Sequence, residues 1–152
     1  MASPVNQAQM ETRIQNRMLE YFETLPDAVF GMLHPRFVSC DYEARTLTVV
    51  ISVQRFMRNN NGVMHGGMIA AALDGIGGLL CHCYTPEGRM SPSIDLSVSY
   101  LAPVPIGELL HVRVTAEHTG RTLLHLRGEA FLMRDGAEQI AASSMATYYI
   151  TE

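Results

Sequence analysis

The residues best suited to chemistry lie in one stretch, 59–80, where a turn, an apolar helix and a carboxylate follow one another. Residues 68–80 consist of Met, Ile, Ala, Leu and Gly, with Asp74 as the one charged exception. A helix that is apolar on every side is normally buried. A carboxylate carried by such a helix loses hydration, which is the environment of a general base or a nucleophile. Asp74 is therefore the first candidate catalytic residue.

The turn before this helix favours an oxyanion site. Segment 59–62 contains three asparagines and Gly62, residue types that accept positive φ and bond to nearby backbone. Gly66 and Gly67 then leave the first N–H groups of the helix open to an outside acceptor. Donors of this kind stabilise negative charge that develops on a carbonyl oxygen. The stretch thus offers an oxyanion hole as well as a base.

One helix cannot bring both groups to the same reacting carbon. Asp74 follows Gly66 by eight residues, which separates them by ~12 Å along a helix axis. Two antiparallel copies related by a two-fold axis place the N-terminus of each helix beside Asp74 of the other. We therefore predict a site shared between subunits. Glycines 75, 77 and 78 each cost about 1 kcal/mol relative to alanine, which indicates that another element approaches closely.

The elements that must position this stretch follow from hydrophobic periodicity. Residues 11–25 have apolar side chains at helical spacing and end at Pro26, which predicts an amphipathic helix covering one edge of the core. A short helical turn is expected at 29–33. From residue 37 the period changes to two, and residues 46–53 alternate as a half-buried strand does.

Strands dominate after the central helix, which is expected at 66–82. Gly120-Arg121 and Asp135-Gly136 are turn sequences that predict two antiparallel hairpins. The expected order is one helix, two strands, the central helix and four strands. This is an α+β architecture, in which an antiparallel sheet of about five or six strands wraps around the central helix and an N-terminal helix covers it. The later strands are expected within 93–100, 108–118, 122–134 and 138–150.

Length and composition set further limits. We expect a single domain, with an N-terminal helical segment at 1–35 and the main domain at 36–152. A net charge of −4 and a pI near 5.8 argue against nucleic acid as a partner. The absence of a signal-like N-terminus and of a long apolar run predicts a cytoplasmic protein without a membrane partner. Cys81-His82-Cys83 lacks a second ligand pair, so no metal site is expected.

The pattern Asn59-x-x-Gly62-x-x-His65-Gly66-Gly67, followed by Asp74, resembles a family signature. The family is the hot-dog-fold acyl-CoA thioesterases of the phenylacetate-degradation type, which include the mammalian thioesterase superfamily member 2 group. Segment 93–103 resembles the strand that follows in that family, and the likeness runs from about 37 to 151. It implies the hot-dog fold, thioester hydrolysis of an acyl-CoA and a homodimer or homotetramer. It implies no cofactor, because coenzyme A is part of the substrate.

The resemblance also implies roles for individual residues. Asp74 is either the base that activates water or the nucleophile that forms a mixed anhydride. The Gly66 N–H and the Asn59 side chain of one subunit polarise the thioester oxygen, while Ser93 holds water beside Asp74 in the other subunit. His65 either contacts the thioester or only fixes the turn. Those alternatives stay open at the level of sequence.

Coenzyme A carries phosphates, which call for basic groups near the mouth of the site. The family often places CoA contacts at the hairpin that corresponds to residues 120–122 here. Arg121 and Thr122 are therefore expected to bind substrate, together with Arg89 and the backbone of Gly67.

Two other functions remain open. The hot-dog fold also permits a module that binds acyl-CoA without cleaving it. The presence of Asp74 beside the Asn59 and Gly66 pair favours the enzyme, because binding alone does not need a desolvated base. A hot-dog dehydratase is the third reading, since His65 and Asp74 would supply its histidine and carboxylate across a dimer.

Overall fold

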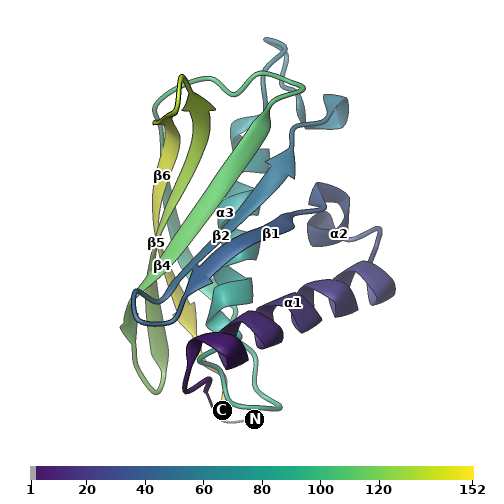
Figure 1. The fold of residues 1–152 in the computed structure, drawn as a ribbon. Coiled ribbons are helices and arrows are strands. Elements are labelled where there is room, and N and C mark those ends of the chain that lie inside the picture. The colour runs from purple at the N-terminus through teal and green to yellow at the C-terminus, as the bar shows by residue number, and fades with distance from the viewer. Residues whose placement is uncertain (1–2) are drawn as a thin grey trace.

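The computed structural model describes residues 3–152 and contains one six-stranded antiparallel sheet with a long helix across one face (Figure 1). The predicted element order is confirmed. Residues 1 and 2 of the expected segment 1–35 lie outside the described residues. The elements are α1 (Gln7–Thr24), α2 (Val29–Leu33), β1 (Arg36–Asp41), β2 (Thr46–Ser52), a 3-10 turn (Arg55–Met57), α3 (Gly66–Cys81), β3 (Ser93–Tyr100), β4 (Leu109–Thr119), β5 (Leu123–Arg134) and β6 (Ala137–Tyr149).

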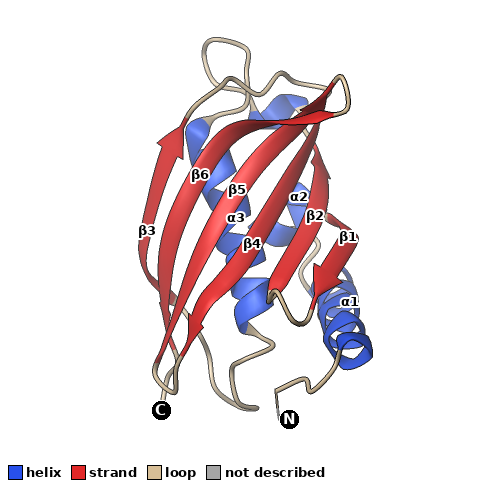
Figure 2. Cartoon of the chain, turned by 60° about the vertical axis from the view of Figure 1, so that its left-hand side comes forward, coloured by secondary structure: helices blue, strands red, loops and turns tan. Residues whose placement is uncertain are grey.

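The strands are arranged in the order β1-β2-β4-β5-β6-β3, so β1 and β3 form the two edges of the sheet (Figure 2). Both predicted hairpins are present, between β4 and β5 and between β5 and β6. Asp135 and Gly136 have φ of 51° and 79°, and positive φ at both central residues is the geometry of a tight hairpin turn. Strand β3 has a neighbour on one side only, which leaves its outer edge unpaired within residues 3–152.

The core lies between α3 and the inner face of the sheet. Leu47, Val49 and Ile51 of β2 are fully buried, as the alternation in 46–53 predicts. Helix α3 buries the side on which Ile69, Leu73 and Ile76 lie. Its opposite side is only half-buried and is made almost entirely of small residues, namely Gly66, Ala70, Ala71, Asp74, Gly75 and Gly78. The expectation of burial on every side is therefore wrong for the single chain, because the sheet covers one side of the helix.

Helix α1 lies beside edge strand β1, as expected of a cover helix (Figure 1). It starts at Gln7, four residues before the predicted start, because the Asn6 side chain caps it by accepting from the Gln9 N–H at 2.9 Å. Gln7 then donates to the Cys40 carbonyl of β1 at 2.7 Å. Met10 and Ile14 of α1 are buried in the common core, so this helix belongs to the same hydrophobic unit as the sheet.

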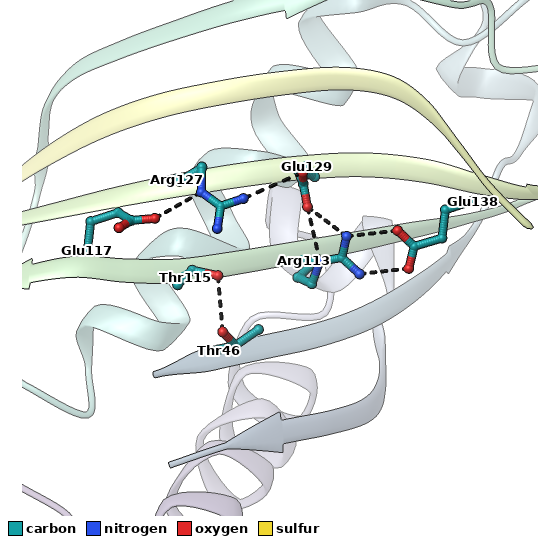
Figure 3. Close-up of polar contacts among 7 residues, drawn as sticks. All are labelled: Thr46, Arg113, Thr115, Glu117, Arg127, Glu129 and Glu138. Atoms are coloured by element: carbon teal, nitrogen blue, oxygen red, sulfur yellow. Dashed lines mark hydrogen bonds and ion pairs between the residues drawn. The ribbon is translucent and has the colours of Figure 1, made fainter. Parts of the chain in front are cut away.

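The outer face of the sheet carries a network of charged side chains (Figure 3). Arg113 of β4 lies at its centre and donates to Glu129 of β5 and to Glu138 of β6. Arg127 bonds to Glu117 and approaches Glu129 at 3.5 Å. These charges pair with one another within and between β4, β5 and β6, on the face that α3 does not cover.

Candidate active site

Asp74 lies in the middle of α3, on the half-buried side of small residues. The Tyr148 hydroxyl donates to the Asp74 backbone carbonyl at 3.0 Å and to carboxylate oxygen Oδ1 at 3.2 Å. Within residues 3–152, no arginine or histidine forms an ion pair with this carboxylate. The carboxylate is thus held by a neutral donor and keeps its negative charge uncompensated, which suits a base or a nucleophile.

Tyr148 was not among the residues expected from the sequence. It lies near the end of β6 with 2% of its surface exposed, and burial is the largest factor that raises the pKa of its phenol. The negative charge of Asp74 raises that pKa further, so Tyr148 remains a protonated donor. Two sequence signals point toward it: an inward position in the alternation of β6, and Gly77 in the middle of a helix.

Gly77 is where the predicted close approach to α3 takes place. A Cβ atom at this position would collide with the Tyr148 hydroxyl oxygen and lie 3.0 Å from its ring carbon Cζ. The other two helix glycines differ, because a Cβ at Gly75 would meet only Phe30, at 3.7 Å, and a Cβ at Gly78 would meet nothing within 4 Å. Close packing therefore explains one of the three glycines.

Ser93 lies on the same side of the sheet as Tyr148. Its Cα partner in β6 is Tyr148, whereas Asp95 pairs with Thr147, so the register shifts between these positions. Strict alternation would group Ser93 with Asp95 on the outer face. The irregularity instead directs Ser93 inward, because directly paired residues share a face. Ser93 is thus paired with Tyr148, the residue whose hydroxyl contacts Asp74, and its own side chain is exposed.

The start of α3 provides one open backbone donor. His65 is the N-cap residue, and its Nδ1 accepts from the Gly67 N–H at 2.8 Å. This bond fixes the turn and occupies one of the two N–H groups that the sequence suggested were open. The Gly66 N–H has no hydrogen-bond partner among the described residues. It is the donor that remains for an outside oxygen.

Asn59 shapes the loop that leads to this donor. Its Oδ1 accepts from the N–H groups of Asn61 at 2.8 Å and Val63 at 3.3 Å. Gly62 completes the turn with a φ of 81°. No described residue accepts from the Asn59 side-chain amide group, so Nδ2 stays available. Asn59 and Gly66 line one cavity of about 400 Å³ together with Tyr100, whose hydroxyl donates to the Gly66 carbonyl at 2.8 Å.

A different groove lies along the turns of α3 that follow Asp74. This groove of about 650 Å³ lies between α1, α3 and residues 85–92, and Gly75 and Gly78 form part of its wall. Asp74 shares a helix face with Gly78, because residues four apart lie above one another. The single chain therefore separates the oxyanion donors from the carboxylate, as the helix spacing predicts.

Three of the four expected substrate-binding residues, Arg89, Arg121 and Thr122, lie toward the end of the molecule where α3 finishes. Arg89 lines the groove beside α3. The Thr122 carbonyl accepts from Ile150 N–H at 2.8 Å, and the next residue, Thr151, donates to the Met90 carbonyl at 2.9 Å. The hairpin that carries Arg121 and the segment that carries Arg89 thus flank the same C-terminal residues. Gly67 lies at the opposite end of α3.

Cys81, His82 and Cys83 are engaged by the core and by α1. Both cysteines are buried, and burial raises the pKa of Cys83 to about 12 and also raises that of Cys81. His82 Nε2 accepts from Arg17 Nε at 2.9 Å. Burial lowers the pKa of His82, and the positive charge of Arg17 lowers it further.

None of the helices in residues 3–152 has the length and apolar character needed to cross a membrane.

Comparison with known proteins identifies the family. Residues 61–137, more than half of the chain, match the family model described as the thioesterase superfamily. The chain belongs to this superfamily. The matched segment includes Gly66, Asp74 and Ser93, whereas Asn59 and Tyr148 lie outside it. The resemblance stated from the sequence and the hot-dog fold are both confirmed.

The chain is also similar to individual proteins and solved structures. Mouse acyl-coenzyme A thioesterase 13 is 30% identical over 73 residues, which make up 48% of this chain and 51% of the relative. The match thus spans about half the length of such curated relatives. The phenylacetic acid degradation-related protein of Ralstonia eutropha has a TM-score of 0.76 and 27% identity, with 90% of this chain and 98% of that chain covered. A Streptococcus mutans protein bound to acetyl CoA has a TM-score of 0.67 and 24% identity, with coverages of 77% and 88%.

Proposed function

We propose that this member of the thioesterase superfamily hydrolyses an acyl-CoA thioester to a free acid and coenzyme A. The observation that carries the proposal is Asp74, a carboxylate without a cationic partner on the small-residue face of α3. The name of the mouse relative supports a CoA thioester as the substrate. The acetyl CoA bound to the Streptococcus mutans protein supports the same ligand class.

The proposed site is shared between two copies of the chain. Edge strand β3 is unpaired on one side and exposes apolar side chains, with Ile94 61% and Tyr100 52% exposed. Such an edge is a template for pairing with another strand. Antiparallel pairing of two β3 strands would extend the sheet and bring two α3 helices side by side. Gly66 of one copy would then approach Asp74 of the other, as the spacing on one helix requires.

The chemistry follows from this arrangement. Water attacks the thioester carbonyl carbon, and the Gly66 N–H and Asn59 Nδ2 donate to the oxygen that becomes negative. Asp74 of the other subunit takes a proton from the water, which Ser93 helps to hold. The carbon–sulfur bond then breaks, and the CoA thiolate leaves and acquires a proton. A nucleophilic Asp74 would reach the same products through an anhydride that water hydrolyses.

The groove along α3 provides a route for the rest of the substrate. It runs from the turn after Asp74 to Arg89, and the hairpin with Arg121 and Thr122 lies at the same end of the molecule. Guanidinium groups bind phosphate oxygens well. We assign the phosphates of coenzyme A to Arg89 and Arg121.

Thiol release from a panel of acyl-CoAs tests the reaction. The panel runs from acetyl through palmitoyl to phenylacetyl and benzoyl, and the melting temperature is recorded with each compound. Release of free CoA from any of them at a rate proportional to enzyme concentration supports hydrolysis. A rise in melting temperature without thiol release would instead identify a binding module.

Mixed dimers test the sharing of the site. Subunits with Asp74→Asn are combined with subunits with Asn59→Ala, so that one of the two sites in each dimer carries both changes and the other carries neither. Each parent is expected to be inactive, and the mixed dimer to regain about half of the wild-type activity. Activity no higher than that of the parents would show that each chain uses its own residues.

A further inference from the structure

Tyr148 contacts Asp74 but has no part in the reaction described above. We propose that Tyr148 is a positioning residue that holds Asp74 Oδ1, so that Oδ2 is the oxygen that acts on the water. This inference rests on the proposed function, since it concerns the same carboxylate. Among the described residues, Oδ2 has no hydrogen-bond partner, whereas Oδ1 accepts from the phenol at 3.2 Å.

The Tyr148 hydroxyl contacts Asp74 at two atoms, one on its backbone and one on its carboxylate. A phenol has one proton to donate, and here it lies between the Asp74 backbone carbonyl at 3.0 Å and the side-chain Oδ1. The hydroxyl therefore ties the carboxylate to its own backbone and restricts rotation of the side chain. Tyr148 is itself held in the core, with 2% of its surface exposed. A rigid ring gives the carboxylate one preferred orientation.

Gly77 provides independent support. The phenol can reach α3 only because position 77 has no side chain, since a Cβ there would collide with the hydroxyl oxygen. Glycine in a helix costs about 1 kcal/mol relative to alanine. Gly77 thus leaves room for the Tyr148 hydroxyl, which donates to the candidate catalytic carboxylate of Asp74.

Tyr148 is the described side chain that donates to this carboxylate. Burial raises the pKa of Tyr148 of β6 and of Cys81 of α3, and the negative charge of Asp74 raises both further, so both groups stay protonated. From α1, α2 and the other strands, no described side chain donates to Asp74.

The first test compares Tyr148→Phe with Tyr149→Phe. Tyr149 is the matched control, because it is the next residue in β6, lies on the other face and is 36% exposed. For Tyr148→Phe we expect kcat to fall about tenfold to hundredfold while KM stays within about twofold, because no substrate-binding group changes. Kinetics like those of Tyr149→Phe would overturn the proposal.

A second variant, on helix α3, disturbs the same contact between Tyr148 and Asp74. Gly77→Ala displaces the hydroxyl without removing it, so kcat should fall in the wild-type background. In the Tyr148→Phe background the same change should cost much less, because the colliding oxygen is gone. Equal losses in both backgrounds would overturn the proposal. The thermal unfolding of each variant is recorded alongside. If Tyr148→Phe folds poorly, Gly77→Ala in the wild-type background still tests the contact, and an unchanged kcat there would overturn the proposal.

A double-mutant cycle measured by unfolding tests the contact between Tyr148 and Asp74 separately from the proposed function. If the wild-type protein releases no thiol from any acyl-CoA, the proposed hydrolysis fails. Denaturant unfolding of Asp74→Ala, Tyr148→Phe and the double variant then measures the coupling of the two side chains without any substrate. Non-additive losses support the positioning contact, and additive losses reject it.

Discussion

The carboxylates on the two sides of the sheet have different kinds of partner. On the outer face, Arg113 donates to both oxygens of Glu138 at 2.8 Å and to Glu129 at 2.7 Å (Figure 3). The Arg113 guanidinium also lies 4.7 Å above the ring of Phe131. On the inner side, residues 3–152 provide Asp74 with no cationic partner and one neutral donor, Tyr148. The outer carboxylates are paired with arginine, and the inner one is not.

This difference separates structure from chemistry. A carboxylate bonded to arginine has its lone pairs and charge committed, so it is a poor base. A carboxylate that only a phenol holds keeps an oxygen and a full charge for a reaction. The comparison therefore favours a structural role for the Glu129 and Glu138 network and supports the catalytic role proposed for Asp74. Variants of Asp74 should lower activity and leave stability almost unchanged. Variants of the outer network should lower stability and leave activity almost unchanged.

The largest expected effect is on the inner side. Asp74→Asn should lower kcat by about 10²- to 10⁴-fold, because the amide cannot take a proton from water. Its oxygen can still accept from Tyr148, so the melting temperature should change little. Glu129→Gln is the matched control on the outer face and should keep kcat within about twofold. Thiol release and thermal unfolding measure both variants, and equal loss of activity in the two would refute the contrast.

A smaller effect, on stability alone, is expected on the outer face. Arg113→Met removes the donor of Glu129 and Glu138 and should lower the free energy of unfolding by about 2 kcal/mol. The methionine still covers part of Phe131, so the sheet should stay folded. Denaturant unfolding gives the loss, and kcat at saturating substrate should remain near the wild-type value. A large drop in kcat without loss of stability would contradict the division between the faces.

The smallest expected effect is the pH dependence of the stability that the Arg113–Glu138 pair contributes. The hydrogen bond from Arg113 is the largest factor that lowers the pKa of Glu138 from its ordinary value of 4.5. A lowered carboxyl pKa in the folded state contributes stability above about pH 4.5, and this stability is lost as the pH falls through the folded value. The melting temperatures of wild type and Glu138→Gln should therefore differ at pH 7 and converge in acid. A difference that stays constant down to pH 3 would argue against this linkage.

Much of the fold could be predicted from local patterns. The alternation in 46–53, the Asp135-Gly136 turn and the Pro26 stop are local signals, and the corresponding elements are present. Asp74 stood out as a charge inside an apolar helix, and its separation from Gly66 follows from helix geometry. The start of α1 was missed because the cap at Asn6 lies before the first strongly apolar turn.

The sequence by itself determined the element order, the family and the identity of the candidate carboxylate, because each depends on residues close together in the chain. The tertiary structure decided which groups meet. The Tyr148 hydroxyl reaches Asp74 across 74 positions, and the register shift in β3 directs Ser93 toward the same region. Capping by His65 left Gly66 as the open donor. Such contacts depend on strand pairing and on side-chain packing between distant segments, which a one-dimensional pattern does not specify.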